Sequence, residues 1–206
     1  MLDCALTDFV TLVVTVDPIG TVPIFLAVAG ERTPREMARL ANHSVLVAGG
    51  VLIAFLVAGQ VLLSAMHISM PSFQVAGGLV LFLFAMTMIF GRDHGGPTPS
   101  AVGRNPAVFP LGMPTIAGPG AILAAVVLTD NDRYNIPHQA VTAFVLLGVL
   151  VLQWALLRAA APIRRWLGEG GASILTRVMG LVLASLSVET VGGGIRDLMQ
   201  HGLPPG

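Results

Sequence analysis

The chain has 206 residues, of which 54% are hydrophobic and 11% are charged, and its mean hydropathy is +0.82. A soluble domain carries about 25% charged residues, so this composition indicates an integral membrane protein. The formal net charge is zero, which argues against a nucleic-acid partner. The single cysteine, Cys4, excludes an intramolecular disulfide and a cysteine-based metal cluster.

Apolar runs of about 20 residues recur along the chain, and each is long enough to cross a hydrocarbon core of about 30 Å. We predict six membrane spans, at 6–29, 44–64, 73–91, 107–129, 140–161 and 175–195. The expected fold class is an all-α integral membrane protein surrounded by membrane lipids.

The first predicted span is interrupted by the stretch DPIG at 17–20. Pro18 removes a backbone donor and clashes with a preceding carbonyl, and Gly20 permits non-helical backbone. A carboxylate inside a bilayer is costly, so Asp17 is expected to face the bundle interior or water. Two roles stay open for Asp17: it either contributes to proton coupling or substrate binding, or it only caps the half-helix that begins at Pro18.

The loop after the first span carries a helix start signal. Thr33 is a candidate N-cap, Pro34 suits the first helical position, and Glu36 stands three residues after Thr33. This capping-box pattern predicts a short helical extension before the second span.

The fourth predicted span is also interrupted. Pro114, Gly118, Pro119 and Gly120 break the helical pattern there as Pro18 and Gly20 do in the first span. A half-helix beginning near Gly118 presents free backbone donors and a positive dipole end, which suits a substrate carboxylate.

The two halves of the chain resemble each other. The sequence GLVL at 78–81 recurs at 180–183, a separation of 102 residues, and Pro18 corresponds to Pro119 at a separation of 101. Each half contains three spans, an odd number, which predicts two inverted-topology three-helix repeats with broken first helices. We therefore divide the chain into a first repeat at 1–91, a cytoplasmic linker at 92–106 and a second repeat at 107–206. Transporters with such repeats bind substrate near the midplane, between paired broken helices.

Positive charge predicts the orientation. The chain contains no lysine, and nine of its eleven arginines lie in the loops after the first, third and fifth spans or at the span ends that border them. Only Arg133 and Arg196 fall on the other side. The bias predicts that the three basic loops are cytoplasmic and that both termini lie outside, in the inner membrane of a cell.

The chain resembles the MarC family of membrane proteins. The resemblance is carried in order by DPIGTVPIFLAVAG at 17–30, HISMPSFQVAGGLVLF at 67–82, FPLGMPTIAGPGAI at 109–122 and LGEGGASILTRVMGLVL at 167–183. It implies six spans and kinship with amino-acid exporters, some of which are described as proton-coupled transporters of glycine and alanine. The family accepts Asn at the position of Asp17, which places a carboxylate-dependent mechanism in doubt.

These observations define the candidate site. The predicted substrate-binding residues are Asp17, Pro18, Gly20, Thr21, Pro114, Thr115, Gly118, Pro119 and Gly120. Asp17 and Glu189 are the candidates for proton coupling, although a water-exposed helix end is the simpler interpretation of Glu189. Gln60, Gln74 and Gln153 are candidates to bridge helices. The histidines at 67, 94, 138 and 201 are expected in loops or the tail without metal-ligand spacing, so no metal or cofactor is expected.

The leading hypothesis is a secondary transporter of a small zwitterionic solute, most plausibly a neutral amino acid. The alternatives are a non-transporting structural or stress-response membrane protein and, more remotely, an intramembrane hydrolase. The sequence contains no GxSxG or HExxH motif, so we do not expect an enzyme. The substrate, the coupling ion and the oligomeric state stay open, and a homo-oligomer is compatible with the apolar composition.

Overall fold

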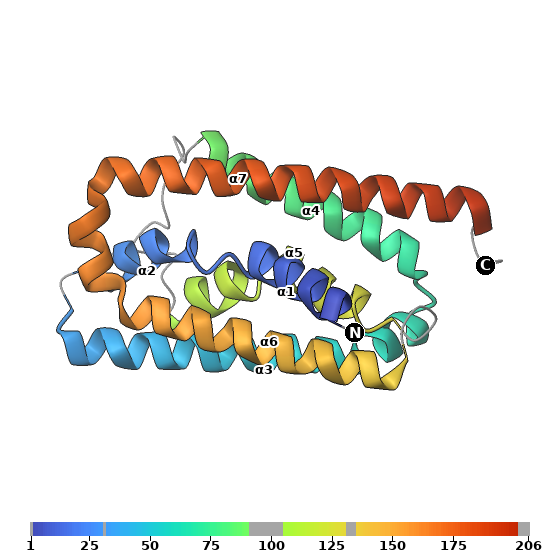
Figure 1. Cartoon of the computed structure of the whole chain (residues 1–206), viewed down its shortest axis with the longest axis horizontal. Coiled ribbons are helices and arrows are strands. Elements are labelled where there is room, and N and C mark those ends of the chain that lie inside the picture. The colour runs from blue at the N-terminus through green and yellow to red at the C-terminus, as the bar shows by residue number, and fades with distance from the viewer. Residues whose placement is uncertain (1, 31, 91–104, 131–134, 202–206) are drawn as a thin grey trace.

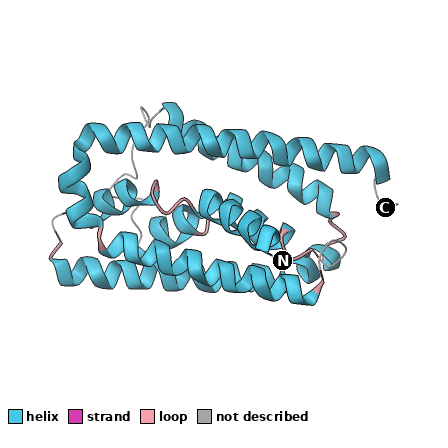
Figure 2. Cartoon of the chain, in the orientation of Figure 1, coloured by secondary structure: helices cyan, strands magenta, loops and turns pink. Residues whose placement is uncertain are grey.

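A computed structural model describes residues 2–30, 32–90, 105–130 and 135–201 of the chain. Every regular element in these ranges is a helix (Figure 2). The helices are α1 (Leu2–Val16), α2 (Thr21–Ala29), α3 (Pro34–Ala65), α4 (Met70–Phe90), η1 (Ala107–Ile116), α5 (Pro119–Val127), α6 (Ile136–Arg158) and α7 (Ala160–His201). Most of the predicted linker at 92–106, including Arg92 and Arg104, lies outside the described residues.

Five segments in the described ranges are long and apolar enough to cross a membrane. They are Ala5–Leu26, Pro34–Ala65, Met70–Phe90, Ile136–Arg158 and Arg177–Gln200. They overlap five of the six predicted spans. The remaining predicted span, 107–129, is occupied by η1 and α5, which have 10 and 9 residues. Each is too short to cross the hydrocarbon core alone, because nine residues of α-helix extend only about 14 Å.

The start of α3 confirms the predicted capping box. The Thr33 backbone N–H donates to Glu36 Oε2 at 2.8 Å, and the Glu36 N–H donates to Thr33 Oγ1 at 3.4 Å. Pro34 occupies the beginning of the helix. With 32 residues, α3 extends about 48 Å, so it is longer than a hydrocarbon core is thick.

The helices form one bundle that consists of two groups (Figure 1). In the larger group, α1, α2, η1 and α5 pack with α3 and α6, and their buried side chains form one core. Phe25, Leu52, Leu111 and Leu146 are fully buried there. In the smaller group, α4 packs lengthwise against α7 around a second core that includes Leu81 and Leu183.

Glycines bring α4 and α7 close together. A Cβ atom added at Gly78 would lie 3.2 Å from the carbonyl oxygen of Ser187, and one added at Gly180 would lie 3.1 Å from the carbonyl oxygen of Ala85. Because those contacts are to backbone, a side chain at either glycine would push the helices apart.

Polar side chains tie the larger group together at the end that carries the N-terminus. Thr142 Oγ1 of α6 donates to Asp8 Oδ2 of α1 at 2.6 Å, and His138 Nε2 lies 3.4 Å from the same oxygen. The Asp8 side chain is only 2% exposed. His138 lies in the first turn of α6, which begins at Ile136, so the prediction that it lies in a loop is wrong. Buried Asp8 was not recognised in the sequence.

The predicted glutamine bridges are found in part. Gln60 Nε2 of α3 donates to Asp130 Oδ1, just beyond α5, at 2.7 Å, which confirms a helix-bridging role for Gln60. Gln153 is fully buried in α6, but its side-chain oxygen and nitrogen have no hydrogen-bond partner in the described part of the chain. The bridge predicted for Gln153 is therefore wrong.

The Asp8–Thr142 contact generates a stability prediction. Thr142→Val keeps the shape of the side chain but leaves a buried carboxylate oxygen without its hydroxyl donor, which costs about 1–3 kcal/mol. We expect a lower unfolding temperature in detergent, measured by intrinsic fluorescence. Thr87→Val is the matched control, because the Thr87 hydroxyl is exposed and donates only to the carbonyl of Phe84. Equal unfolding temperatures for the two variants would contradict the assignment.

Candidate functional site

The first helix break is organised by Asp17. Its N–H donates to the carbonyl of Val13 at 3.0 Å and completes α1. Its own carbonyl accepts from the Thr21 N–H at 3.1 Å and from Thr21 Oγ1 at 2.9 Å. Between these bonds the backbone of Asp17 turns into the left-handed region, with φ of 49°, which Asp and Asn tolerate better than most residues.

The side chain of Asp17 supports the same turn. Oδ1 accepts from the Gly20 N–H at 2.9 Å, so the carboxylate caps the turn at 18–20. The helix predicted to begin at Pro18, α2, is found only from Thr21, and its N-cap residue, Gly20, has no side-chain cap. Oδ2 has no hydrogen-bond partner among the described residues. One carboxylate oxygen therefore holds the backbone while the other stays available.

Position 20 requires glycine because the Asp17 carboxylate leaves no room for a side chain there. The φ of Gly20, −67°, suits any residue, but a Cβ atom at this position would collide with the Asp17 carboxylate, including Cγ at 2.7 Å. The absence of a side chain at position 20 thus allows the carboxylate to reach the Gly20 N–H.

The second helix break lacks such a cap. η1 is a π-helix whose last bond runs from the Ala117 N–H to the carbonyl of Gly112, at 2.9 Å. Gly118 is extended, and Pro119 begins α5 without a backbone donor. The first intrahelical bond of α5 runs from the Ile122 N–H to the carbonyl of Gly118, at 3.0 Å. In the described ranges no side chain caps this helix start.

The N-terminus of α5 therefore offers hydrogen-bond donors. The N–H groups of Gly120 and Ala121 precede that first intrahelical bond. Together with the positive end of the helix dipole, they favour a negatively charged group.

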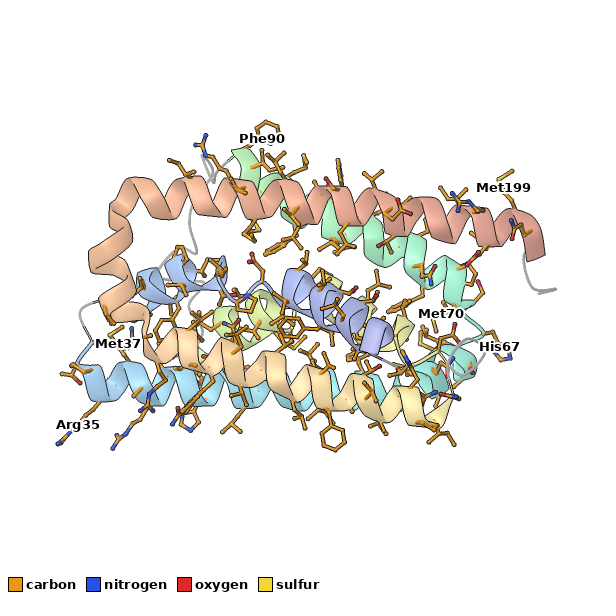
Figure 3. All side chains as sticks on the ribbon, viewed as in Figure 1. Arg35, Met37, His67, Met70, Phe90 and Met199 are labelled. Atoms are coloured by element: carbon orange, nitrogen blue, oxygen red, sulfur yellow. The ribbon has the colours of Figure 1, made fainter. Side chains whose placement is uncertain are left out.

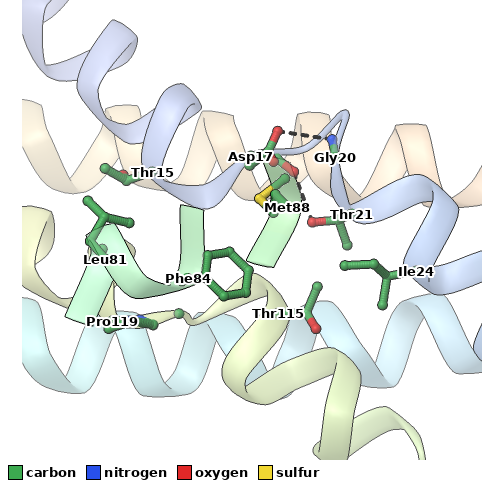
Figure 4. Close-up of a pocket in the computed structure, with 12 residues that line it drawn as sticks. Thr15, Asp17, Gly20, Thr21, Ile24, Leu81, Phe84, Met88, Thr115 and Pro119 are labelled. Carbon is green, nitrogen blue, oxygen red and sulfur yellow. Dashed lines mark hydrogen bonds between the residues drawn. The ribbon is translucent and has the colours of Figure 1, made fainter. Parts of the chain in front are cut away.

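Both breaks open onto one pocket (Figure 4). The pocket is narrow and partly open to the outside. The pocket is lined by Thr15, Asp17, Gly20, Thr21, Ile24, Leu81, Phe84, Met88, Thr115, Gly118, Pro119 and Gly120. One wall consists of the two breaks with their polar groups, and another is the apolar face that α4 contributes.

Polar groups in the pocket include three threonines besides Asp17. The hydroxyls of Thr15 and Thr21 donate to the carbonyls of Thr11 and Asp17, at 2.8 and 2.9 Å. Because each hydroxyl donates to backbone, its oxygen can still accept a hydrogen bond. The pocket thus combines acceptors at the first break with backbone donors at the second.

Seven of the nine predicted substrate-binding residues line this pocket. Pro18 is buried and is not among the lining residues, and the side chain of Pro114 lies outside the part of the chain that the structure describes. Glu189 is exposed on α7, away from the lining residues. Substrate binding by the seven, and proton coupling by Asp17 or Glu189, stay predictions.

Five lining residues were not predicted. Thr15 stands two residues before Asp17, so its polarity next to a break was a usable signal. Ile24 and the three residues of α4, Leu81, Phe84 and Met88, carried no signal, because an apolar residue facing a pocket looks like one facing lipid.

The fold and the paired breaks define a polytopic α-helical membrane protein whose irregular backbone surrounds a partly polar pocket. The profile described as MarC family integral membrane protein matches residues 2–199. The chain belongs to the MarC family.

Relatives cover most of the chain. It is 32% identical over 195 residues to UPF0056 inner membrane protein YhgN of Escherichia coli, covering 93% of this chain and 95% of the relative. It is 34% identical over 195 residues to a UPF0056 membrane protein of Buchnera aphidicola subsp. Schizaphis graminum, covering 92% and 90%. It is 27% identical over 206 residues to UPF0056 inner membrane protein MarC of Salmonella arizonae, covering 93% of each. These names state a membrane location and no substrate, and no solved structure matches the chain.

The geometry of Asp17 predicts different outcomes for two substitutions. Asp17→Asn keeps an oxygen acceptor for the Gly20 N–H and a residue type that tolerates positive φ, so the unfolding temperature should change little. Asp17→Ala loses the cap, at about 1 kcal/mol, and places a less suitable residue in the left-handed region, at about 1–2 kcal/mol. Thermal unfolding in detergent checks this order. A less stable Asn variant than Ala variant would contradict the capping role.

Proposed function

We propose that the chain is a secondary transporter of small zwitterionic solutes, most plausibly neutral amino acids of the glycine and alanine type. The proposal rests on one observation: the pocket has a hydrogen-bond acceptor at the first break and backbone donors at the second. Asp17 Oδ2 at the first break can accept from a substrate ammonium, and the N–H of Gly120, which lines the pocket at the start of α5, can donate to a substrate carboxylate. An arginine is not required, and none lines the pocket in the described chain.

An inverted repeat is supported by matching contacts between α4 and α7. Gly78 approaches the carbonyl of Ser187, and Gly180 approaches the carbonyl of Ala85. Gly180 lies 102 residues after Gly78, and Ser187 lies 102 residues after Ala85. Each contact is therefore the counterpart of the other under the separation found in the sequence, as expected for two antiparallel helices related by a pseudo-two-fold axis.

The other helices pack in a corresponding way. α3 contacts both η1 and α5, while α6 contacts both α1 and α2. α4 contacts α5, while α7 contacts α2. In a transporter with this plan, each half supplies one broken helix to a shared site, and one half moves against the other to alternate access.

The proposed location is an inner membrane with both termini outside the cytoplasm. In Figure 3, Arg35 lies at the end of the bundle where α3 begins, and His67 lies at the opposite end. Arg35 and Arg39 lie near the start of α3, and Arg158 lies at the end of α6 beside Asn42 of α3, so these arginines share the first of these ends. An excess of arginine on one side of a membrane favours the cytoplasm for that side. Relatives named as inner membrane proteins support the same location.

Uptake into liposomes tests the proposal. Purified protein is reconstituted, and uptake of labelled glycine, alanine and serine is measured with and without an imposed pH gradient, against protein-free liposomes. Saturable uptake supports a carrier, and stimulation by the gradient supports proton coupling. No uptake of any of the three by demonstrably folded protein would contradict the amino-acid proposal and favour a non-transporting role.

Asp17→Asn then separates the two roles proposed for the carboxylate. If Asp17 carries the coupled proton, the variant keeps saturable uptake and loses its response to the pH gradient. If Asp17 holds the substrate ammonium, the variant instead binds the amino acid more weakly.

Gly120→Leu should abolish uptake. A Cβ atom at Gly120 would already lie 2.6 Å from Leu81 Cδ1, so the larger side chain fills the pocket beside the α5 donors. Gly148→Leu is the matched control, because Gly148 is exposed on α6 and an added Cβ would meet nothing within 4 Å. Both variants are first checked for folding by size-exclusion chromatography. Unchanged substrate affinity in folded Gly120→Leu would rule out this binding site.

Phe84→Ala should broaden the substrate range. Phe84 belongs to the apolar wall that limits the room for a substrate side chain. Its truncation should raise uptake of valine or leucine relative to glycine by about tenfold, a typical effect of pocket size on aliphatic selectivity. Phe90→Ala is the control, since Phe90 is on the same helix and 72% exposed. An unchanged valine-to-glycine ratio would show that α4 does not set the size limit.

A further inference from the structure

A cluster of polar side chains lies on the surface where α3 packs against α6. It is at the end of the bundle where α3 begins and α6 ends, which we call the arginine-rich end. Trp154 Nε1 donates to Asn42 Oδ1 at 2.8 Å, and Arg158 Nη1 lies 3.5 Å from the same oxygen. The guanidinium carbon of Arg158 lies 5.3 Å from the centroid of the Trp154 ring, which is a cation–π arrangement. We call Asn42, Trp154 and Arg158 the tryptophan cluster.

The length of α3 places the cluster at the depth of lipid headgroups when Ala65 is taken as one edge of the hydrocarbon core. About twenty residues are needed to cross the hydrocarbon core, and about twenty residues counted back from the end of α3 at Ala65 reach Leu46. Asn42 lies about 6 Å further along the helix axis. Tryptophan and arginine are both typical of this boundary.

Two more arginines lie on the same face of α3. Arg35, Arg39 and Asn42 are spaced at i, i+4 and i+7, so they follow one stripe of the helix. Arg35, Arg39 and Arg158 are exposed, and none of the described carboxylates forms an ion pair with them. The carboxylate of Glu36 accepts the cap bonds from Thr33 and interacts with Arg39 only electrostatically, without an ion-pair contact.

An apolar stripe continues from the tryptophan cluster toward the membrane centre. On α3, Leu46 is 71% exposed, and on α6, Val151 is 62% exposed. Leu46 follows Asn42 by one turn, and Val151 precedes Trp154 by one turn on the antiparallel helix. Charged donors at headgroup depth followed by exposed aliphatic side chains match the two parts of a phospholipid.

We propose that the tryptophan cluster, with Arg39, binds an anionic phospholipid in the leaflet at the arginine-rich end. The lipid phosphate accepts hydrogen bonds from the guanidinium groups of Arg158 and Arg39, and an acyl chain lies along Leu46 and Val151. Asn42 and Trp154 hold the Arg158 side chain in place, so less conformational freedom is lost on binding. This site is independent of the pocket and of the transport proposal.

The test uses the fluorescence of Trp154, which is one of only two tryptophans in the chain. Full-length protein carrying Trp166→Phe is reconstituted in phosphatidylcholine with a fixed fraction of brominated phosphatidylglycerol or brominated phosphatidylcholine. Bromine quenches a tryptophan only at close range, so the ratio of the two quenching efficiencies reports local enrichment of the anionic lipid. We expect stronger quenching by the brominated phosphatidylglycerol.

Substitutions of the arginines sharpen the test. Arg158→Gln or Arg39→Gln should each lower the enrichment by up to about fivefold, the effect of roughly one arginine at an anionic surface. Arg196→Gln is the control, since Arg196 is exposed near the opposite end of α7. Arg39 takes no part in the hydrogen bonds of the tryptophan cluster, so its variant tests the charge without disturbing the cluster.

Two outcomes would overturn the proposal. One is equal quenching by the two brominated lipids in the parent protein. The other is a loss of enrichment in Arg196→Gln as large as in Arg39→Gln and Arg158→Gln, which would indicate only a general response to net charge.

Discussion

Lipid offers no hydrogen bonds, so a helix that breaks inside a bilayer must find partners for its free backbone groups within the protein. At the first break one residue supplies most of them. The N–H of Asp17 ends α1, its carbonyl accepts two bonds from Thr21, and its carboxylate accepts the N–H of Gly20. The direction of α2, and with it the wall of the pocket, depends on this set of bonds.

The second break has different hydrogen bonds from the first, and this difference places donors and acceptors on opposite sides of the pocket. Gly118 has no side chain to cap α5, so donors remain at the helix start, whereas Asp17 leaves a free acceptor at the first break. Two breaks that were equivalent in every residue would present like groups to a bound solute. The different residues at positions 17 and 118 give the pocket donors on one side and an acceptor on the other.

Local signals in the sequence were sufficient for several features. Thr33, Pro34 and Glu36 predicted the start of α3, because a capping box is made within four residues. The prolines and glycines marked both breaks, because their backbone effects do not depend on distant neighbours. Local signals were not sufficient for the glutamines, whose hydrogen bonds depend on distant segments. Gln60 donates to a residue 70 positions away, whereas the side chain of Gln153 has no partner among the described residues.

Features that depend on contacts between distant segments could not be predicted from the sequence. Asp8 and His138 are joined only because α1 packs against α6, and a separation of 130 residues carries no local signal. Leu81, Phe84 and Met88 line the pocket, yet other apolar residues of α4 face outward. Leu83, for example, is 65% exposed. The order of apolar residues along α4 cannot identify its inner face, because lipid and protein interior are both apolar.

The close approach of Gly20 to the Asp17 carboxylate has a consequence for how the sequence can diverge. A side chain at position 20 is excluded only while position 17 carries a side chain that fills the same space. The two positions are therefore epistatic: the cost of a substitution at one depends on which residue occupies the other. Replacement by asparagine at position 17 preserves the constraint, since its side chain has the same shape as aspartate. A shorter residue at 17 removes the obstacle at 20, and with it the hydrogen bond from the Gly20 N–H to the side chain at 17.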